Sequence, residues 1–303
     1  MPSHPDLANL AKSAWRLSVQ PALFARNRSA RYAAAGIATA VDLPVVRIDP
    51  LTGQGTCEAR CAYTERLSRG HLQQYRDAHG SWHWRPWLGT ACIIALNAYA
   101  SHAAYTEAVG RRTGKAFHRS LNKARRLGYV TRFFPPDHLQ TSIAGILRSK
   151  LMRSGGIVPY RILPSSSPPA DLGLPARYRP AGWCPLHWKL HFGVFLPPAA
   201  ATSEIDMPRW QLVGYVKIRR MGSLVHALQI MGHGDHLAGG INDLMQIDLM
   251  QWLFDDPDGL AGGVTHYMYG AIEHAGEGLA NWKIRRGFRP VLLDVMGTGP
   301  PEK

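Results

Sequence analysis

Three β-like runs follow one another in the second half of the chain, and this feature limits the fold more than any other. Residues 187–196 (HWKLHFGVFL) and 211–220 (QLVGYVKIRR) alternate apolar and polar side chains. A third run, 223–230 (SLVHALQI), comes directly after a tight turn at Met221-Gly222. Alternation with a period of two is typical of half-buried strands, and so short a link joins antiparallel neighbours. The sequence therefore predicts antiparallel hairpins at the centre of a sheet.

Helical and strand patterns alternate around these hairpins. Residues 241–254 carry apolar side chains at i, i+3 and i+4 spacing, which predicts a helix. The other elements expected in this region are helix 115–126, strand 129–134, helix 137–153, strand 264–269, helix 277–286 and strand 290–295. From the strand at 129 onward the order is β-α-β-β-β-α-β-α-β. It predicts an α/β chain of the α+β kind, with a largely antiparallel sheet flanked by helices, and argues against a doubly wound nucleotide-binding fold.

The first third of the chain has a different pattern. An Ala-rich basic helix is expected near 29–40, and a short strand at 43–48 (LPVVRI). Residues 87–105 are apolar but are interrupted by polar side chains, so they favour a buried helix over a membrane span. We therefore expect a mostly helical N-terminal region at 1–109 and a second domain at 110–303.

The chain is strongly basic, with a formal net charge of +14 and an isoelectric point near 10.0. This charge favours anionic partners such as nucleic acid or a phosphorylated cofactor, although a merely soluble basic protein is the alternative. In helix 115–126, Phe117, Leu121 and Ala124 recur at helical spacing, and cations occupy the other sides. The residues expected to bind nucleic acid or another anion are Arg119, Lys123, Arg125 and Arg126.

Cysteine usage gives little sign of a disulfide scaffold or a metal centre. The chain has four cysteines, and Cys57 and Cys61 form one C-x3-C pair without an evident second pair. Reduced thiols are the first interpretation and a zinc site is the alternative. The N-terminal segment lacks an apolar stretch of the signal-peptide type, so we expect a cytoplasmic protein with no membrane span. The oligomeric state stays open.

Two segments resemble those of a known family. GLANWKIRRGFRP (278–290) is similar to a segment near the end of Fem-type and related GNAT-like N-acyltransferases. In those proteins a helix with an aromatic-Lys pair runs into Gly-Phe before the last strand. FHRSLNKARRLGY (117–129) resembles the basic helix that they place before a strand. The resemblance covers about 110–303, and it implies a GNAT-like fold and direct transfer of an acyl group to an amine.

The resemblance also implies a donor-binding loop between the third antiparallel strand and its helix. In GNAT enzymes the backbone N–H groups of this loop hold the pyrophosphate of acyl-CoA, acetyl-CoA among them. HLAGGIND occupies this place, and its expected donor-binding residues are His236, Gly239, Gly240, Ile241 and Asn242. His236 stands where the family has Arg or Gln, and the two glycines are adjacent rather than spaced. Two alternatives stay open: aminoacyl-tRNA as the donor, as in Fem-type enzymes, and a glycine turn without a ligand.

Acyl transfer to an amine needs a base for the amine, donors for the developing oxyanion and an acid for the leaving group. Many GNAT enzymes have a tyrosine four residues before the Gly-Phe pair, where this chain has Lys283. Our catalytic candidates are Lys283, His266, Glu273 and Tyr267. Alternation along the strand places His266 and Met268 on one face, and Tyr267 and Tyr269 on the other.

Three functions remain open at this stage. The first is an N-acyltransferase for a small amine, in which Tyr215 and Lys217, on one face of their strand, either line an acceptor groove or simply pack. The second acylates an amine of a nucleobase or nucleic acid, with helix 115–126 holding phosphates. The third is a non-enzymatic nucleic-acid-binding protein on a GNAT scaffold. Hydrolase, P-loop, H-E-x-x-H and dinucleotide motifs are absent from the sequence.

Overall fold

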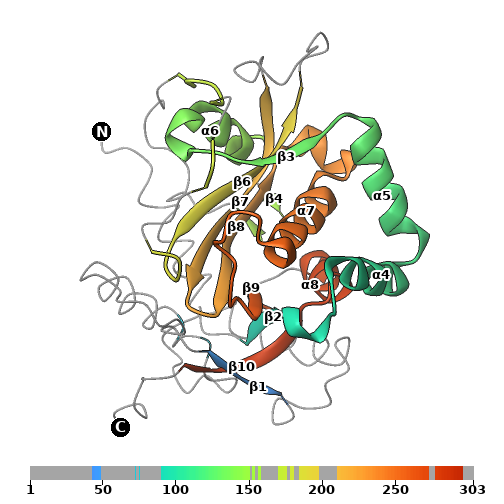
Figure 1. Cartoon of the computed structure of the whole chain (residues 1–303). Helices are drawn as coiled ribbons and strands as arrows, with labels where there is room; N and C mark the ends of the chain where they lie inside the picture. The colour runs from blue at the N-terminus through green and yellow to red at the C-terminus, as the bar shows by residue number, and fades with distance from the viewer. Residues whose placement is uncertain are drawn as a thin grey trace, which may run out of the picture.

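A computed structural model gives the structure of the chain, and it describes residues 43–48, 72, 75, 90–150, 152–153, 156–157, 170–175, 178–180, 184–197, 210–272 and 277–295 (Figure 1). Among these residues an eight-stranded sheet has the order β1-β10-β2-β9-β8-β7-β6-β3. The pairs β1–β10 and β8–β9 are parallel, and the other neighbours in this sheet are antiparallel. The mixed, largely antiparallel sheet with flanking helices is an α+β arrangement, as the sequence predicts.

The longest strands lie in the middle of the chain's second half. They are β7 (Gln211–Met221) and β8 (Leu224–Gly232), and the link between them contains Gly222 at φ 59°. A left-handed backbone of this kind favours glycine. The other strands of the sheet are β1 (Val45–Ile48), β2 (Ala91–Ala95), β3 (Val130–Phe133), β6 (Lys189–Leu196), β9 (His266–Ala271) and β10 (Arg289–Val295). A separate two-stranded ribbon consists of β4 (Met152–Arg153) and β5 (Gly156–Ile157).

Helices cover both faces of the sheet (Figure 1). On one face α7 (Ile241–Asp255) packs on β6, β7 and β8, and α4 (His102–Thr113) and α5 (Lys115–Arg126) pack against α7. The short helix α8 (Glu277–Arg285) contacts α4 on this side. On the other face α6 (Gln140–Arg148) packs on β7 and β8. Short 3-10 segments, η2 (Leu96–Ala98), η3 (Pro136–His138) and η6 (Gly234–Gly239), precede α4, α6 and α7.

Between residues 115 and 295 the predicted elements are present in the predicted order with shifted ends, but the helix expected at 137–153 ends at Arg148. Residues 152–153 form β4, which pairs with β5 in a ribbon that the sequence did not predict. α5 buries the predicted stripe of Phe117, Leu121 and Ala124 against the main hydrophobic cluster. α8 ends before Gly287, whose φ of 93° allows the chain to turn into β10. The strand expected at 43–48 is present as β1, where it pairs with β10.

Two expectations for the first third are corrected. Residues 87–105 were expected to form one buried helix, but 91–95 form β2, between β9 and β10, and α4 starts only at His102. The run ACIIA is buried nearly throughout, and a short apolar run has no periodicity to separate a strand from a helix. The boundary expected between residues 109 and 110 falls inside α4, and β1 and β2 belong to the same sheet as β9 and β10.

Several expectations concern residues that the structure leaves undescribed. The Ala-rich helix near 29–40, the mostly helical character of 1–42, Cys57, Cys61 and Glu273 all lie outside the described residues. Within the described ranges, Cys92 and Cys184 are buried, and no cluster of three or more His, Cys, Asp or Glu side chains is arranged to hold a metal ion. None of the described helices has the length and apolar character needed to cross a membrane.

Candidate active site

The parallel strands β8 and β9 stay together over only part of their length. Paired residues run from Leu224 with His266 to His226 with Met268, whereas β8 continues to Gly232 and β9 to Ala271. The carboxyl halves of the two strands therefore separate. A narrow gap lies there, and its lining includes Ile230 of β8, Tyr267 of β9, Asn242 and Gln246 of α7, and Trp282 of α8.

Two polar atoms in the lining of this gap are buried without a hydrogen-bond partner in the described structure: the Tyr267 hydroxyl and Asn242 Oδ1. Burial raises the pKa of the Tyr267 phenol well above its ordinary value, so the hydroxyl keeps its proton. An unbonded buried polar group costs about 1–3 kcal/mol. The gap as it stands has no room for a water molecule, so a ligand reaches this unused donor and this unused acceptor only when neighbouring side chains move aside.

The side of the gap formed by α8 is fixed to the first turn of α7. Trp282 Nε1 donates to Asp243 Oδ1 at 3.2 Å, and Arg286 donates to the same oxygen from Nε at 3.1 Å and from Nη2. The Arg286 guanidinium also lies 4.8 Å from the ring centroid of Phe117 in α5. Trp282 lines the gap and is itself partly exposed.

Lys283 has a structural position in this arrangement. Its side chain is 3% exposed, Nζ donates to the Ala271 carbonyl at 2.9 Å, and the ammonium lies 4.5 Å from the ring centroid of Tyr269. Leu279, Trp282 and Phe288 pack into the main cluster on the same side. These contacts hold α8 against β9. Lys283 is absent from the lining of the gap, so the structure does not bring this catalytic candidate together with Tyr267.

His266 also lies away from Tyr267. The two side chains alternate along β9, and Tyr267 points into the cluster beneath α7 while Met268 joins a different cluster on the opposite face. Thr265 Oγ1 lies 2.8 Å from His266 Nδ1, and burial lowers the pKa of this histidine. The predicted separation of His266 and Met268 from Tyr267 and Tyr269 is confirmed, and it leaves His266 on the far side of the sheet from the gap.

The expected donor loop is η6 together with the first turn of α7. Both of its adjacent glycines are buried against protein. A Cβ at Gly239 would lie 2.9 Å from the Tyr129 ring, and a Cβ at Gly240, where φ is 85°, would lie 2.5 Å from the Ser120 carbonyl oxygen of α5. Packing alone thus requires glycine at both positions. Ile241 is fully buried, so only its backbone is able to contact a donor. The N-terminus of α7 has no side-chain cap.

His236 faces the same part of the molecule but is held by other side chains. Its Nδ1 lies 2.8 Å from the Tyr129 hydroxyl, and its ring centroid lies 5.4 Å from that of His233. Burial, and then the neighbouring His233, lower the pKa of His236. A histidine with a lowered pKa is neutral at pH 7, so it does not supply the fixed positive charge that an arginine has at this place.

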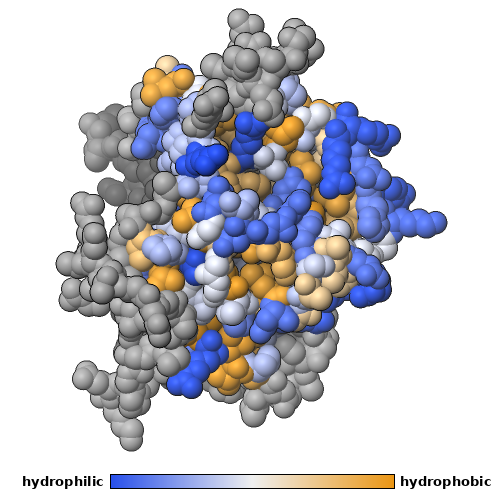
Figure 2. Space-filling view, in the orientation of Figure 1, coloured by the Kyte–Doolittle hydropathy of each residue, from blue (hydrophilic) through white to orange (hydrophobic). Residues whose placement is uncertain are grey.

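The four cations predicted to bind an anion are all exposed on α5. Within the described ranges, Arg119, Lys123, Arg125 and Arg126 take part in no ion pair, and the helix has no acidic residue. Figure 2 shows the hydrophilic surface that gathers over this helix. α5 also carries Ser120, which touches Gly240, so the basic surface adjoins the start of α7.

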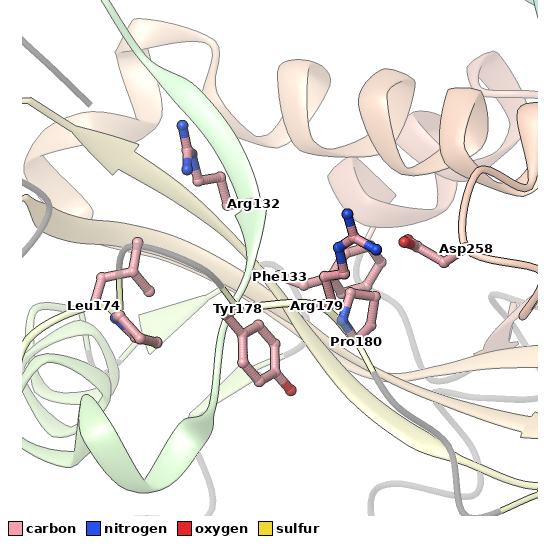
Figure 3. Close-up of a pocket in the computed structure, with 8 residues that line it drawn as sticks. Arg132, Phe133, Leu174, Tyr178, Arg179, Pro180 and Asp258 are labelled. Carbon is pink, nitrogen blue, oxygen red and sulfur yellow. The ribbon is translucent and has the colours of Figure 1, made fainter. Parts of the chain in front are cut away.

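A second hollow lies at the outer strand β3. It has a volume of about 470 Å³ and is lined by Arg132 and Phe133 of β3, residues of the segments 170–175 and 178–180, and Asp258. Arg179 and Asp258 point toward one another, whereas Arg132 points away from both (Figure 3). Asp258 already accepts a hydrogen bond from Trp252 Nε1 at 3.0 Å. This hollow is separate from the gap and holds none of the predicted site residues.

Sequence reasoning placed Tyr267 among the catalytic candidates and Asn242 in the donor loop, but it did not foresee that they line one gap. A signal was present in α7. Asn242 and Gln246 are spaced i, i+4 within a helix whose remaining side chains are mostly apolar, so they share one face of it. Polar side chains on a face that packs on a sheet are uncommon. Gln246 Nε2 donates to the Tyr105 hydroxyl at 3.4 Å, whereas Asn242 Oδ1 has no partner in the described structure.

No protein-family model matches the chain, and no curated protein does. Among solved structures, FemX is similar over 67% of this chain and 59% of its own, at 12% identity and a TM-score of 0.43. L-PGS from Bacillus licheniformis is similar over 59% of this chain and 44% of its own, at 16% identity and a TM-score of 0.31. The C-terminal (DUF2156) domain of a putative lysylphosphatidylglycerol synthetase from Agrobacterium fabrum is similar over 67% and 58%, at 11% identity and a TM-score of 0.35. The chain thus spans less than two thirds of each of these structures.

Proposed function

We propose that the chain is an aminoacyltransferase that moves an aminoacyl group from a tRNA ester to an amine, with the reacting groups held in the gap between β8 and β9. One observation carries this proposal: the gap contains an unbonded hydroxyl donor on Tyr267 and an unbonded oxygen acceptor on Asn242. A carbonyl group needs a donor and an amine needs an acceptor. The gap therefore matches the two partners of an acyl transfer to nitrogen.

The chemistry follows from these two groups. The amine donates an N–H to Asn242 Oδ1, which directs the nitrogen lone pair at the ester carbonyl. As the new C–N bond forms, the Tyr267 hydroxyl donates to the carbonyl oxygen, which gains negative charge. The C–O bond to the ribose then breaks, the amine loses a proton and the ribose oxygen gains one. The raised pKa of Tyr267 keeps it a hydrogen-bond donor throughout.

The choice of tRNA as donor rests on α5. Its exposed cations form no ion pairs among the described residues, and the chain carries a net charge of +14. A polyanion is the partner that such a helix fits. In addition, the loop glycines are packed against Ser120 and Tyr129, so their presence gives no separate support to a pyrophosphate cradle for acyl-CoA.

Transfer to nitrogen is tested with tRNA charged with labelled amino acids, the purified chain and a mixture of small amines. An aminoacyl ester is cleaved by mild alkali, whereas the amide product is not. We expect label in an alkali-stable product. Transfer of label from acetyl-CoA and not from charged tRNA would show that the donor is an acyl-CoA. No transfer from either donor would contradict the proposed function.

The role of Tyr267 is tested by Tyr267→Phe, which leaves the ring in place. We expect kcat to fall by a factor of about 100, which is typical when one oxyanion donor is removed. Tyr269→Phe is the matched control, because Tyr269 shares the strand face and does not line the gap. Equal rates for both variants would exclude the Tyr267 hydroxyl from the reaction.

A further inference from the structure

A group of basic side chains lies on the face of the sheet that is turned away from α7. We call it the basic belt, and it consists of Lys189, His191, Lys217 and Arg219. These residues alternate along β6 and β7 with Leu190 and Ile218, which join the cluster beneath α7. Tyr215, two residues before Lys217, packs instead into the cluster under α6. Tyr215 and Lys217 therefore share one face of β7, as predicted, and this is the face that carries the basic belt.

The strand register sets the belt residues side by side. Lys189 lies opposite Arg219, and His191 lies opposite Lys217. Residues directly opposite in an antiparallel pair have Cβ atoms about 5 Å apart, and like charges in such positions are destabilising. The belt runs between two apolar clusters of the same face, one with Leu212 under α6 and one with Leu224. Three permanent cations are thus gathered on a face that is otherwise largely apolar.

No acidic side chain neutralises this charge within the described ranges. None of the belt residues takes part in an ion pair there. Asp137 acts on His191, but burial and Lys217 outweigh it and lower the pKa of that histidine to about 4. Burial also lowers the pKa of Lys189, and Arg219 and Lys217 lower it further. Among the described residues, these mutually repelling cations therefore lie together without an ion-paired counter-charge.

Unused hydrogen-bond donors lie at the same place. Arg219 Nε is buried and has no partner in the described structure. Gln229 lies opposite Lys217 on β8, and its Oε1 accepts a hydrogen bond from the Tyr215 hydroxyl at 3.1 Å. The amide group of Gln229 is thereby oriented with its N–H groups left to donate. Hydrogen-bond donors and positive charge are thus close together in the basic belt, and an anion with several oxygen atoms is able to interact with both.

We propose that the basic belt binds a phosphoryl group, with Lys189, Lys217 and Arg219 donating to its oxygens. A guanidinium fork matches the geometry of phosphate oxygens, and an ammonium on each side supplies further charge. A single carboxylate balances only one of the three cations, whereas a phosphate monoester carries close to two charges at pH 7. The phosphoryl group belongs either to a soluble phosphate ester or to a phospholipid headgroup. The belt is on the opposite face from Tyr267, so this site does not depend on the proposed function.

The experiment compares thermal unfolding of the full chain in inorganic phosphate and in chloride of equal ionic strength. We expect phosphate to raise the unfolding temperature of the wild type. In the double variant Lys217→Gln/Arg219→Gln, we expect the phosphate affinity to fall about tenfold or more, because charge-assisted hydrogen bonds are lost. The same variant should be at least as stable as the wild type in chloride, since it relieves repulsion, and a purely structural role of these residues predicts the reverse.

Arg148→Gln/Arg285→Gln is the matched control, because it removes the same charge from exposed positions of α6 and α8 that form no ion pair in the described ranges. This variant should keep the phosphate effect in full. Cosedimentation with phosphatidylcholine vesicles, with and without phosphatidic acid, separates the two sources: binding that needs phosphatidic acid and is lost in the belt variant identifies a lipid headgroup. The proposal is overturned if neither phosphate nor these vesicles bind, or if the belt variant and the wild type respond alike.

Discussion

Lys283 donates a hydrogen bond from its buried ammonium to the carbonyl oxygen of Ala271, at 2.9 Å, and this bond joins α8 to the end of β9. The same ammonium lies over the ring of Tyr269. A lysine that is 3% exposed and bound in this way holds two elements together. Its place in the sequence, four residues before Gly287-Phe288, suggested catalysis, whereas its surroundings indicate stability.

Lys283→Met tests that interpretation. The apolar part of the side chain is kept, but the Ala271 carbonyl loses this donor, so we expect the free energy of unfolding to fall by about 1–3 kcal/mol. Arg285→Met, on an exposed position of the same helix, should change it by less than about 0.5 kcal/mol. Urea unfolding measures both. Unchanged stability together with lost aminoacyl transfer would return Lys283 to the catalytic set.

Gly240→Ala tests the contact between the loop and α5. The new Cβ would meet the Ser120 carbonyl oxygen at 2.5 Å, at a residue whose φ of 85° is already unfavourable for alanine. Gly259→Ala is the control, because Gly259 has a φ of 69° with no atom within 4 Å of the added Cβ. In both variants the positive φ adds backbone strain of about 1 kcal/mol or more to the folded state. We therefore expect the free energy of unfolding to fall further for Gly240→Ala than for Gly259→Ala, and equal losses in urea unfolding would contradict the close contact with Ser120.

The α5 surface predicts a salt dependence. Each phosphate contact contributes about 0.7 to 0.9 to the slope of log affinity against log salt. Replacing Arg119, Lys123, Arg125 and Arg126 by Gln should therefore reduce the slope for tRNA binding by about 3. The charge-matched control replaces four exposed arginines that are scattered over other elements: Arg47, Arg148, Arg179 and Arg285. Fluorescence anisotropy over a salt series gives both slopes, and equal slopes would exclude α5 as the tRNA surface.

Local patterns predicted the second half of the chain because each element there has a clear period or a clear stop. β7 and β8 alternate around Gly222, and α5 buries one stripe and exposes its cations. The sequence of β2, ACIIA, is apolar at every position, so it has no period that separates a strand from a helix, and only its neighbours β9 and β10 decide its conformation. The pairing of β1 with β10 joins residues more than two hundred positions apart, and no local pattern reports it.

The candidate site was predictable in its residues but not in its geometry. Tyr267 and Asn242 were both named from the sequence, yet they meet only because β8 and β9 separate after His226 and Met268. The amino-acid composition of the two strands does not indicate where they separate. The burial of Lys283 was not predictable either, because a lysine at the basic end of a helix is ordinarily a surface residue.

His191 predicts a pH dependence of stability. Its pKa in the folded chain is lowered from 6.5 to about 4 by burial and then by Lys217, with Lys189 adding to the effect and Asp137 opposing it. The unfolded chain takes up the proton near pH 6.5, and the folded chain only near pH 4. Lowering the pH through this window therefore favours the unfolded state, by up to roughly 3 kcal/mol.

Urea unfolding across that window should show the wild type losing stability as the pH falls, and His191→Gln losing less, because glutamine takes up no proton. His118→Gln, on an exposed position of α5, is the control and should follow the wild type. Lys217→Gln removes one of the causes, so the pKa of His191 measured by NMR should rise in that variant. Parallel pH profiles for the wild type and His191→Gln would show that this imidazole is as accessible to protons in the folded chain as in the unfolded one.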